Sequence, residues 1–380
     1  MAKIKQIFLF IFLILLFSCS QEESIKCGAE RTNEYLPLIK NKRVAIIGNQ
    51  TSRIGKTHLV DSLISFGINI TKVFSPEHGF RGSEDAGAII SDDIDPKTGL
   101  TIVSLYGTNK KPNKNQLKEV DILIFDIQDV GARFYTYIST LHYVMEAAAE
   151  NNIEIIILDR PNPNGHYIDG PIREAGYESF VGMHPIPIVH GMTIGEYAKM
   201  INGEKWISKK CNLRIIRMEN YSHKSKYNLP IRPSPNLPNQ KSINLYPSLC
   251  LFEGTIMSVG RGTDFPFQHF GAPFLKSSYE FTPTSRKGSI SPKYQDLICY
   301  GNDLRNISFL KTIRLDWIIN AYNLCPEKDK FFNSFFDKLA GNSSLREQII
   351  SGKNEKEIKE KWNKDLNQFK LVREKYLIYK

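Results

Sequence analysis

The hydrophobic positions of the chain fall into short continuous runs, separated by segments with helical spacing. Apolar residues recur at helical intervals in segments 57–66 and 136–150. Continuous apolar runs are typical of strands that are buried on both faces of a parallel sheet. Because these runs alternate with helical segments, we predict an α/β protein with a Rossmann-like parallel sheet in its N-terminal domain. The five predicted strands are 44–48, 70–74, 101–105, 120–125 and 153–158.

The alternation becomes less regular after residue 158. Two further strands are expected, at 186–189 and 213–218, with a helix at 194–202 between them. Segment 230–247 is rich in Pro and Asn, which predicts a boundary or an extended connector.

The last part of the chain has a different pattern, which ends in a charged helix with one apolar face. We therefore expect two domains. A Rossmann-like domain would span residues 41–249, and a second, smaller α/β domain would span residues 250–380 and complete a cleft with the first. The apolar face of the final helix consists of Ile358, Trp362, Leu366, Phe369 and Val372.

The N-terminus has the pattern of an export signal. Lys3 and Lys5 precede an apolar run at 7–17 that is too short to span a bilayer comfortably. The run ends in Leu-Phe-Ser-Cys, which resembles a bacterial lipoprotein cleavage box. We expect a signal peptide at 1–18, a lipidated Cys19 and a polar tether at 19–40, and hence a lipoprotein of the bacterial cell envelope, periplasmic or outer-membrane anchored. The alternative is an ordinary secretory signal with an incidental cysteine.

Charge and cysteine content narrow the possible partners. The 380-residue chain has a net charge of +10, but its lysines are scattered without a basic stripe that alternates with aromatic residues. Nucleic acid is therefore not an expected partner. The chain has six cysteines. Those that follow Cys19 are odd in number and form no Cys-x-x-Cys pair, so a disulfide framework is not expected.

Every predicted strand of the sheet is followed by a polar loop. Because the carboxyl ends of parallel strands meet at one edge of a sheet, these loops predict a single ligand cleft there. The candidate residues are Asn49 and Gln50 after the first strand, Glu77, His78 and Arg81 after the second, Asp126, Asp129, Arg133 and Tyr135 after the fourth, and Asp159, Arg160 and Asn162 after the fifth.

The loops lack the motifs of nucleotide and metal enzymes. There is no Gly-x-Gly-x-x-Gly, no Walker loop, no Gly-x-Ser-x-Gly and no His-Glu-x-x-His, so no cofactor is expected. His184 and His190 lack an acidic or cysteine partner at ligand spacing, so no metal site is expected. The remaining carboxylates, amides, arginines and aromatic rings suit a carbohydrate.

Glu77 is the best candidate for a catalytic acid. Cleavage of a glycosidic bond requires two carboxyl groups, one of which is protonated. Glu77 follows a predicted buried strand and lies between Pro76 and Gly79, with His78 placed to orient it or to bind substrate. The alternatives are that Glu77 caps a helix or pairs with Arg81.

The acids and the arginine that follow the fourth strand also have structural interpretations. Asp126 and Asp129 could cap the helix that follows, and Arg133 could pair with one of them.

Several long motifs resemble one known family. NQTS, SPEHGFRG, SLYG, FDIQDVGARFYTYISTL, LDRPNPNG, HPIPIVHGMTIGEYA, PSPNL and YPSLCLFEGTIMSVGRGTDFPFQHFGAPF are similar to the motifs of NamZ-type exo-β-N-acetylmuramidases over roughly residues 43–380. The resemblance implies a two-domain glycoside hydrolase that releases N-acetylmuramic acid from the non-reducing ends of peptidoglycan fragments such as MurNAc-GlcNAc. It places the catalytic glutamate at Glu77, beside His78.

The resemblance leaves the second catalytic group open. The candidate carboxylates are Asp126, which we take as the third catalytic residue, Asp129, Glu253 and Asp264. Carboxyl groups about 5–5.5 Å apart imply retention of configuration, and about 6.5–9.5 Å implies inversion. The third route uses the acetamido group of the substrate as nucleophile. The candidates for binding the lactyl carboxylate are Arg81, Arg133, Arg160 and Arg261.

Two other functions remain as alternatives. A lipid-anchored protein that binds muropeptides without cleaving them would need the same cleft but no catalytic acid. A peptidoglycan amidase is disfavoured by the missing metal-ligand spacing.

Overall fold

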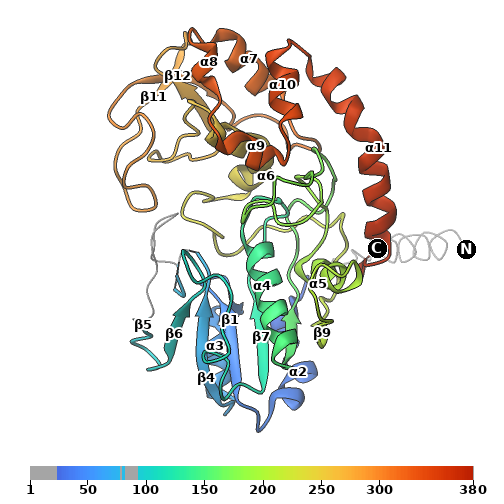
Figure 1. Ribbon diagram of the computed structural model, residues 1–380. Coiled ribbons are helices and arrows are strands. Elements are labelled where there is room, and N and C mark those ends of the chain that lie inside the picture. The colour runs from blue at the N-terminus through green and yellow to red at the C-terminus, as the bar shows by residue number, and fades with distance from the viewer. Residues whose placement is uncertain (1–23, 78, 82–92, 380) are drawn as a thin grey trace, which may run out of the picture.

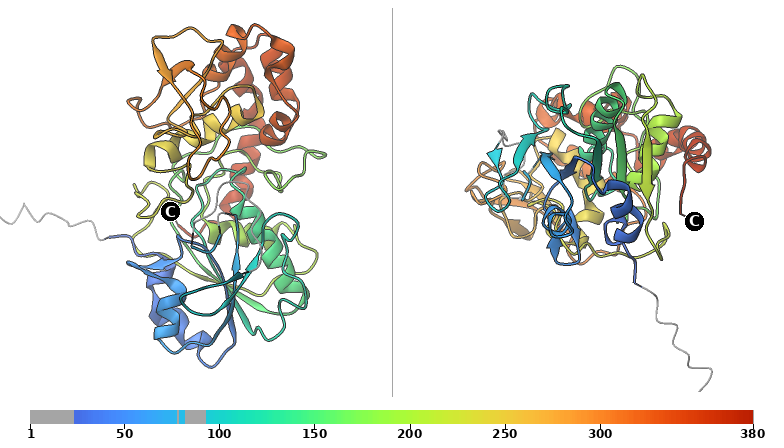
Figure 2. Two further views of the ribbon diagram at one scale, coloured as in Figure 1. Left: turned by 90° about the vertical axis from the view of Figure 1, so that its left-hand side faces the viewer. Right: turned by 90° about the horizontal axis from the view of Figure 1, so that it is seen from below.

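The computed structural model describes residues 24–77, 79–81 and 93–379. Figure 1 shows the two halves of the chain one above the other, with the central sheet in the lower half and a helix-rich region in the upper half. Figure 2 shows the same division from the side and places the C-terminus close to the junction.

The central sheet has seven strands in the order β5-β6-β4-β1-β7-β8-β9. All neighbouring strands are parallel except the edge pair β5 and β6. Apart from β5, this is the strand order of a Rossmann fold, in which successive strands are added on one side of β1 and then, from β7 on, on its other side. The predicted fold class is therefore confirmed. The strands are β1 (Val44–Gly48), β4 (Ile70–Ser75), β5 (Asp93–Ile94), β6 (Thr101–Ser104), β7 (Ile122–Asp126), β8 (Glu154–Leu158) and β9 (Leu213–Ile216).

Helices cover both faces of this sheet because successive residues of each strand point to opposite sides. In β1, Ala45 and Ile47 belong to the core that includes α4 and α5, whereas Val44 and Ile46 belong to the core beneath α2 and α3. The five residues of β1 are all buried, which is why its apolar run is continuous. These helices are α2 (Thr32–Ile39), α3 (Leu59–Ser65), α4 (Tyr137–Glu150) and α5 (Ile194–Gly203), and a small hairpin formed by β2 (Arg53–Ile54) and β3 (Thr57–His58) follows β1.

The C-terminal region contains a three-stranded antiparallel sheet, in the order β10-β12-β11, surrounded by helices. One continuous hydrophobic core runs from the α4 face of the large sheet into this region. The elements are α6 (Gln240–Leu249), η2 (Cys250–Gly254), β10 (His269–Ala272), β11 (Tyr279–Phe281), β12 (Cys299–Asp303), α7 (Asp316–Leu324), α8 (Lys328–Phe331), α9 (Phe335–Ala340), α10 (Ser344–Ile350) and α11 (Glu355–Glu374).

The expected tether at 19–40 is folded over the part that the structure describes. Residues 28–30 form a short 3-10 helix, η1 (Gly28–Glu30), and α2 follows it. Tyr35 and Ile39 are fully buried against the sheet. Gly28 donates a backbone hydrogen bond of 2.8 Å to Asp159, and a Cβ atom at this glycine would lie 2.5 Å from the backbone nitrogen of Asp159. The polar residues that follow Cys19 therefore lead into a segment that packs as part of the domain.

Two other expectations from the sequence were wrong. Segment 186–189 is not a strand, because Val189 makes only isolated bridges, to Ala132 and Asp169. Its apolar residues are buried between the two halves of the molecule rather than in a sheet. The connector expected at 230–247 ends earlier, because α6 begins at Gln240, where the Asn239 side chain accepts a hydrogen bond from the Ser242 backbone and caps the helix.

The described cysteines form no disulfide bond, and the described helices do not include a membrane span. The five described cysteines, Cys27, Cys211, Cys250, Cys299 and Cys325, are buried and free. Among the described residues, no helix has both the length and the apolar character needed to cross a membrane.

Candidate active site

Glu77 lies in a tight turn at the carboxyl end of β4. β4 ends at Ser75, and the Gly79 backbone nitrogen donates a hydrogen bond of 3.2 Å to the Pro76 carbonyl. Gly79 has a φ of 75°, a conformation that glycine adopts at little cost. The turn therefore directs Glu77 away from the strand, and the side chain is half-buried. His78, the other titratable residue expected here, lies outside the described residues.

Two hydroxyl groups orient the Glu77 carboxyl group. The Thr136 hydroxyl, at the start of α4, donates a hydrogen bond of 3.2 Å to Oε2. The Tyr106 hydroxyl, after β6, also hydrogen-bonds this carboxyl group. Burial first, and then the charge of Glu77, raise the pKa of Tyr106, so this phenol stays protonated as a donor. Side chains from three elements therefore meet at the carboxyl end of the sheet.

Tyr137 fixes the backbone of the same turn. Its hydroxyl accepts a hydrogen bond of 3.0 Å from Asn49 Nδ2 and donates one of 3.5 Å to the Glu77 carbonyl. Asn49 is fully buried, and its Oδ1 accepts from the backbone nitrogen and the hydroxyl of Thr51. Asn49 thus supports the turn through Tyr137, and all of its side-chain bonds are made within the protein.

A row of aromatic rings leads from this turn into the C-terminal region. The ring of Tyr135 lies 4.8 Å from Tyr137 and 5.9 Å from Tyr246, and Tyr246 lies 5.0 Å from Phe267. We call these four residues the aromatic row. The Tyr135 hydroxyl and Gln50 Nε2 both donate to the Pro233 carbonyl, at 2.9 and 3.1 Å. The row therefore connects the polar end of the sheet with the second half of the chain.

Glu253 and Arg261 lie at the far end of the aromatic row. Arg261 lies over the Phe267 ring, at 5.0 Å from its centroid, and its Nε donates to Glu253 Oε1 at 2.6 Å. About a quarter of each side chain is exposed, at 25% for Glu253 and 26% for Arg261. The pair is therefore accessible to a polar ligand. Asp264, in the same segment, pairs instead with Arg286 and has a side chain that is 79% exposed.

Asp126, which we predicted as a catalytic residue, is part of a buried ion pair. Arg160 donates to both of its carboxylate oxygens, at 2.5 and 2.9 Å, and also to the Arg53 carbonyl. Asp126 is fully buried and Arg160 is 6% exposed. The ion pair therefore connects the segments that follow β1, β7 and β8, and both side chains have a structural role.

Arg133 and Arg81 are also held by the protein. The Arg133 guanidinium is fully buried and donates to four carbonyl groups, those of Pro171, Ile186, Leu339 and Ala340. Arg81 forms a two-point ion pair with the buried Asp95 and a further contact with Asp61. Neither arginine has the geometry expected of a residue that receives a carboxylate ligand.

Asp159 and Asn162 bind other parts of the chain. Asp159 accepts from the Arg160 and Gly195 backbone nitrogens and from the Thr193 and Tyr379 hydroxyls. Burial raises the pKa of Asp159 to about 6. The Asn162 side chain donates a hydrogen bond to the Met192 carbonyl and accepts one from the Asn164 backbone nitrogen.

Asp129 is a buried acid with an incomplete set of partners. Its Oδ2 accepts a hydrogen bond of 2.6 Å from the Gly131 nitrogen, and Oδ1 has no hydrogen-bond partner. Burial raises its pKa to about 7. His190 Nε2 lies 3.8 Å from Oδ2, and burial lowers the pKa of this histidine to about 3. Asp129 is only 4% exposed, so a ligand would not reach it directly in this conformation.

Among the described residues, no group of three or more His, Cys, Asp and Glu side chains is arranged to hold a metal ion.

The structure places two of the predicted site residues, Asn49 and Glu77, around one turn and adds residues that the sequence did not single out. We did not predict the roles of Tyr106, Thr136, Tyr137 and Tyr246. The sequence did offer a signal for three of them, because Tyr106 directly follows a predicted strand and Thr136 and Tyr137 begin a predicted helix.

Comparison with known proteins gives consistent matches over most of the chain. The family model "Exo-beta-N-acetylmuramidase NamZ, N-terminal" matches residues 44–241, and "Exo-beta-N-acetylmuramidase NamZ, C-terminal" matches residues 244–379. The chain is 43% identical over 371 residues to the peptidoglycan beta-N-acetylmuramidase NamZ of Bacillus subtilis (strain 168), covering 91% of this chain and 89% of that protein.

Two crystal structures of DUF1343 family proteins from Bacteroides fragilis NCTC 9343 are also similar. One has 48% sequence identity and a TM-score of 0.89, and the other has 32% identity and a TM-score of 0.83. Each similarity covers 94% of this chain and 99% of the other protein.

Proposed function

The chain belongs to the exo-beta-N-acetylmuramidase NamZ family, and from this premise we propose that it is an exo-acting glycoside hydrolase of peptidoglycan. Its substrate class is a peptidoglycan fragment with N-acetylmuramic acid at the non-reducing end, such as MurNAc-GlcNAc. The reaction adds water across the glycosidic bond and releases free N-acetylmuramic acid. The expected cleft lies where Rossmann folds bind ligands, outside the carboxyl ends of the strands.

The geometry of Glu77 is the observation that carries the chemical proposal. Glu77 is half-buried at the carboxyl end of β4, and Thr136 and Tyr106 fix its carboxyl group. A positioned carboxylic acid can give its proton to the glycosidic oxygen as the bond to C1 breaks, which makes the sugar a better leaving group. We assign this role to Glu77.

Glu253 and Arg261 are the best-placed polar pair for the rest of the substrate. The other candidate second carboxylates are held in the buried ion pair with Arg160, buried in the loop after β7, or exposed beside Arg286. Arg261 lies over Phe267 at the end of the aromatic row and is partly exposed. Arg81 is also partly exposed beside an aromatic ring, but Asp95 and Asp61 hold its guanidinium. We propose that this pair binds the lactyl carboxylate and a hydroxyl group of the muramic acid.

Product analysis tests this function. The purified protein should convert MurNAc-GlcNAc into the two monosaccharides, detected by mass spectrometry, and should leave the GlcNAc-GlcNAc disaccharide intact. Proton NMR of the first-formed anomer then distinguishes retention from inversion. Tight binding of MurNAc-GlcNAc without any product after long incubation would contradict the proposal and favour a muropeptide-binding protein.

We also propose that the protein is a lipoprotein attached to the cell envelope through Cys19. The support is the basic, apolar and Leu-Phe-Ser-Cys sequence at the N-terminus, which lies outside the described residues. Membrane anchoring would place the enzyme in the compartment that contains peptidoglycan. Metabolic labelling with a fatty acid should mark the wild-type protein and not the Cys19→Ala variant. Equal labelling of both would contradict lipidation at this residue.

A further inference from the structure

A second concave site lies outside the carboxyl ends of β1, β7 and β8. Its volume is about 400 Å³, within the range of ligand-binding pockets. Thr51 after β1, Gln128 after β7 and Arg160 after β8 line it, whereas Glu77 does not. The strand order reverses between β1 and β7, which are neighbours in the sheet (Figure 1), and open α/β sheets bind ligands at such a position. We call this site the β1–β7 crevice.

Arg160 offers an unused donor to the crevice. Its Nε and Nη2 donate to Asp126, and Nη2 also donates to the Arg53 carbonyl. Nη1 has no hydrogen-bond partner in the described part of the chain, although the residue is only 6% exposed. Because Nη1 is not enclosed by protein atoms, it opens toward the crevice that Arg160 lines. The ion pair with Asp126 therefore leaves one amino group of Arg160 for a ligand.

Gln128 offers an acceptor at the same place. Its Nε2 donates to the Asp129 and Pro161 carbonyls, at 2.8 and 2.7 Å, which fixes the orientation of the amide. Among the described residues, Oε1 has no hydrogen-bond partner, and Gln128 is only 3% exposed. A ligand that satisfies both buried side chains carries an acceptor for Arg160 and a donor for Gln128.

The β2–β3 hairpin places two cations, Arg53 and Lys56, at the crevice. Arg53 Nε donates to the Gln50 carbonyl at 3.1 Å, and Nη1 donates to the Lys56 carbonyl at 3.3 Å. Gly55, in the turn of the hairpin, has a φ of 57°, which glycine adopts at little cost. The hairpin therefore holds Arg53 in position before a ligand binds, which lowers the entropy cost of binding.

The charge of the crevice favours an anion. The two hairpin cations and Arg160 line it together with a single carboxylate, that of Glu30. Asp126 neutralises Arg160 from the buried side, and the balance is still positive because the hairpin cations form no ion pair with a described residue. A lining of this sign attracts negatively charged ligands.

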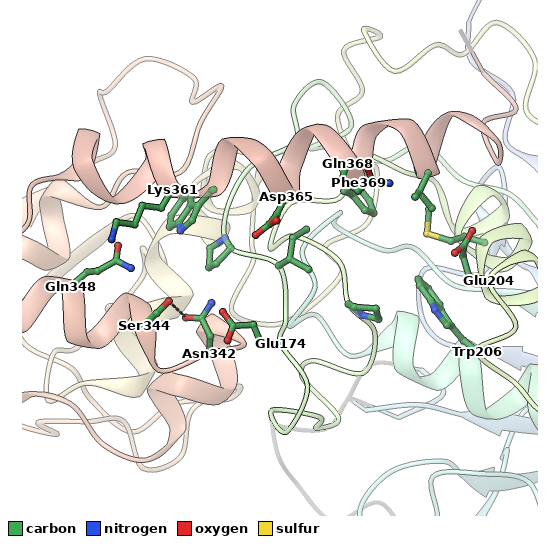
Figure 3. Close-up of a pocket in the computed structure, with 16 residues that line it drawn as sticks. Glu174, Glu204, Trp206, Asn342, Ser344, Gln348, Lys361, Asp365, Gln368 and Phe369 are labelled. Carbon is green, nitrogen blue, oxygen red and sulfur yellow. Dashed lines mark hydrogen bonds between the residues drawn. The ribbon is translucent and has the colours of Figure 1, made fainter.

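A larger hollow beside α11 has the opposite charge. Its volume is about 630 Å³, and Figure 3 shows the carboxylates of Glu174, Glu204 and Asp365 around it, with Lys361 on α11. Acids outnumber bases in this lining. An anionic ligand would therefore favour the β1–β7 crevice over the α11 hollow, and Lys361 offers a charge-matched control.

An apolar wall distinguishes an organic anion from an inorganic one. Leu229, Pro230 and Ile231 line the crevice beside its charged groups. Methyl or methylene groups of a ligand would contact this wall, whereas a phosphate or chloride ion would leave it unused.

We propose that the β1–β7 crevice binds a small organic acid that carries an amide or hydroxyl donor near its carboxylate. The carboxylate accepts from Arg160 Nη1 and lies close to the hairpin cations, and the donor binds Gln128 Oε1. The site rests on the geometry of the crevice, and only the choice of ligand sources rests on the proposed function. Peptidoglycan fragments offer two sources, the lactyl carboxylate of muramic acid and the terminal carboxylate of a stem peptide.

Calorimetry of the purified protein with N-acetylmuramic acid and with N-acetylalanyl-alanine tests the proposal. Binding of the acylated dipeptide identifies a peptide carboxylate as the ligand. Binding of two equivalents of N-acetylmuramic acid, one at the proposed active site and one in the crevice, identifies the sugar acid. Lys56→Glu should weaken crevice binding about tenfold or more, because it reverses a charge near the carboxylate. Lys361→Glu makes the same change of net charge in the α11 hollow and should bind like the wild type.

Two further comparisons keep the test specific. Lys56 is exposed in the turn of the hairpin, so its variant should fold, and Ile231→Trp, which fills the crevice from the apolar wall, should also weaken binding. N-acetylglucosamine and the amide of the dipeptide lack the carboxylate and should not bind the crevice.

Four results would each overturn the site. They are the absence of any acid binding that Lys56→Glu weakens, equal weakening by Lys361→Glu, equal binding of the neutral amide, and binding of inorganic phosphate as tight as that of the acids. Failure of the proposed function would appear instead as absent turnover of MurNAc-GlcNAc by the wild type, which leaves the result with the acylated dipeptide unaffected.

Discussion

The Tyr379 hydroxyl donates a hydrogen bond of 2.8 Å to Oδ2 of Asp159, although the two residues are 220 positions apart in the sequence. Asp159 follows β8 at the polar edge of the sheet, and Tyr379 follows α11 at the end of the chain. The backbone nitrogens of Ile378 and Tyr379 also donate to Glu196. The C-terminal segment therefore closes the fold by returning to the first half of the molecule.

Removal of this hydroxyl should reduce stability without affecting catalysis. Tyr379→Phe leaves a buried acceptor with one donor fewer, and we expect the free energy of unfolding to fall by about 1–3 kcal/mol. Urea denaturation followed by circular dichroism measures this change. Tyr300→Phe is the control, because the Tyr300 hydroxyl makes no hydrogen bond within the described part of the chain. Equal stability of both variants would show that the Asp159 contact contributes nothing.

The buried pair of Asp126 and Arg160 predicts a loss of stability when one member is removed. Asp126→Ala leaves the Arg160 guanidinium buried without its counter-ion, which should cost about 3–5 kcal/mol. Thermal denaturation should show a large decrease in melting temperature. Asp264→Ala, at an exposed ion pair, should change stability by less than about 0.5 kcal/mol. An Asp126→Ala variant with normal stability and no activity would return Asp126 to the catalytic role that the sequence suggested.

The Thr136 hydroxyl should contribute to catalysis by orienting Glu77. Thr136→Val has a similar shape but cannot donate to Oε2, so we expect kcat to fall about tenfold or more with KM little changed. Thr136→Ser keeps the hydroxyl and is the matched control, with activity close to the wild type. Steady-state kinetics on MurNAc-GlcNAc provides the comparison. Equal kcat values for the Val and Ser variants would contradict the orienting role.

Stability should decrease as the pH falls below about 6.5, the usual pKa of histidine. Burial lowers the pKa of His58 to about 4, of His184 to about 2, of His190 to about 3 and of His269 to about 4. These four histidines stay neutral in the folded protein but take up protons when it unfolds, which favours the unfolded state in acid.

Three buried acids act in the opposite direction. Burial raises the pKa of Asp129 to about 7, of Asp159 to about 6 and also of Asp126, so the stability that they contribute is present at low pH and is lost as the pH rises through their folded-state pKa values. Because the histidines outnumber these acids, the melting temperature should be highest near neutral pH and should fall steadily toward about pH 4.5. A melting temperature that rises over the same interval would contradict this balance.

Most of the sheet could be predicted from the sequence because its strands are buried on both faces and therefore form uninterrupted apolar runs. Segment 186–189 has the same kind of run, but its burial comes from contact between the two halves of the molecule, which a local pattern cannot distinguish from a strand. Residues 24–40 were misinterpreted for a related reason. The packing of Tyr35 and Ile39 against the sheet and the backbone contact of Gly28 with Asp159 make this segment part of the domain.

The position of the polar edge could also be predicted, but the partners of its residues could not. Asp159 has its partner Tyr379 near the end of the chain, and Arg133 donates to the carbonyl groups of Leu339 and Ala340. A buried polar residue that supports the fold and one that binds a ligand have the same pattern in a sequence. The difference depends on contacts between residues that are distant along the chain.

The central claim is that Glu77 supplies the proton for cleavage, and kinetic analysis of Glu77→Gln tests it most directly. Glutamine keeps the size of the side chain and removes the transferable proton, so MurNAc-GlcNAc turnover should fall by about 10²–10⁴-fold while the circular dichroism spectrum and melting temperature are retained. Glu280→Gln, an exposed residue of β11, is the control and should be fully active. Turnover by Glu77→Gln at a rate close to the wild type would contradict the assignment.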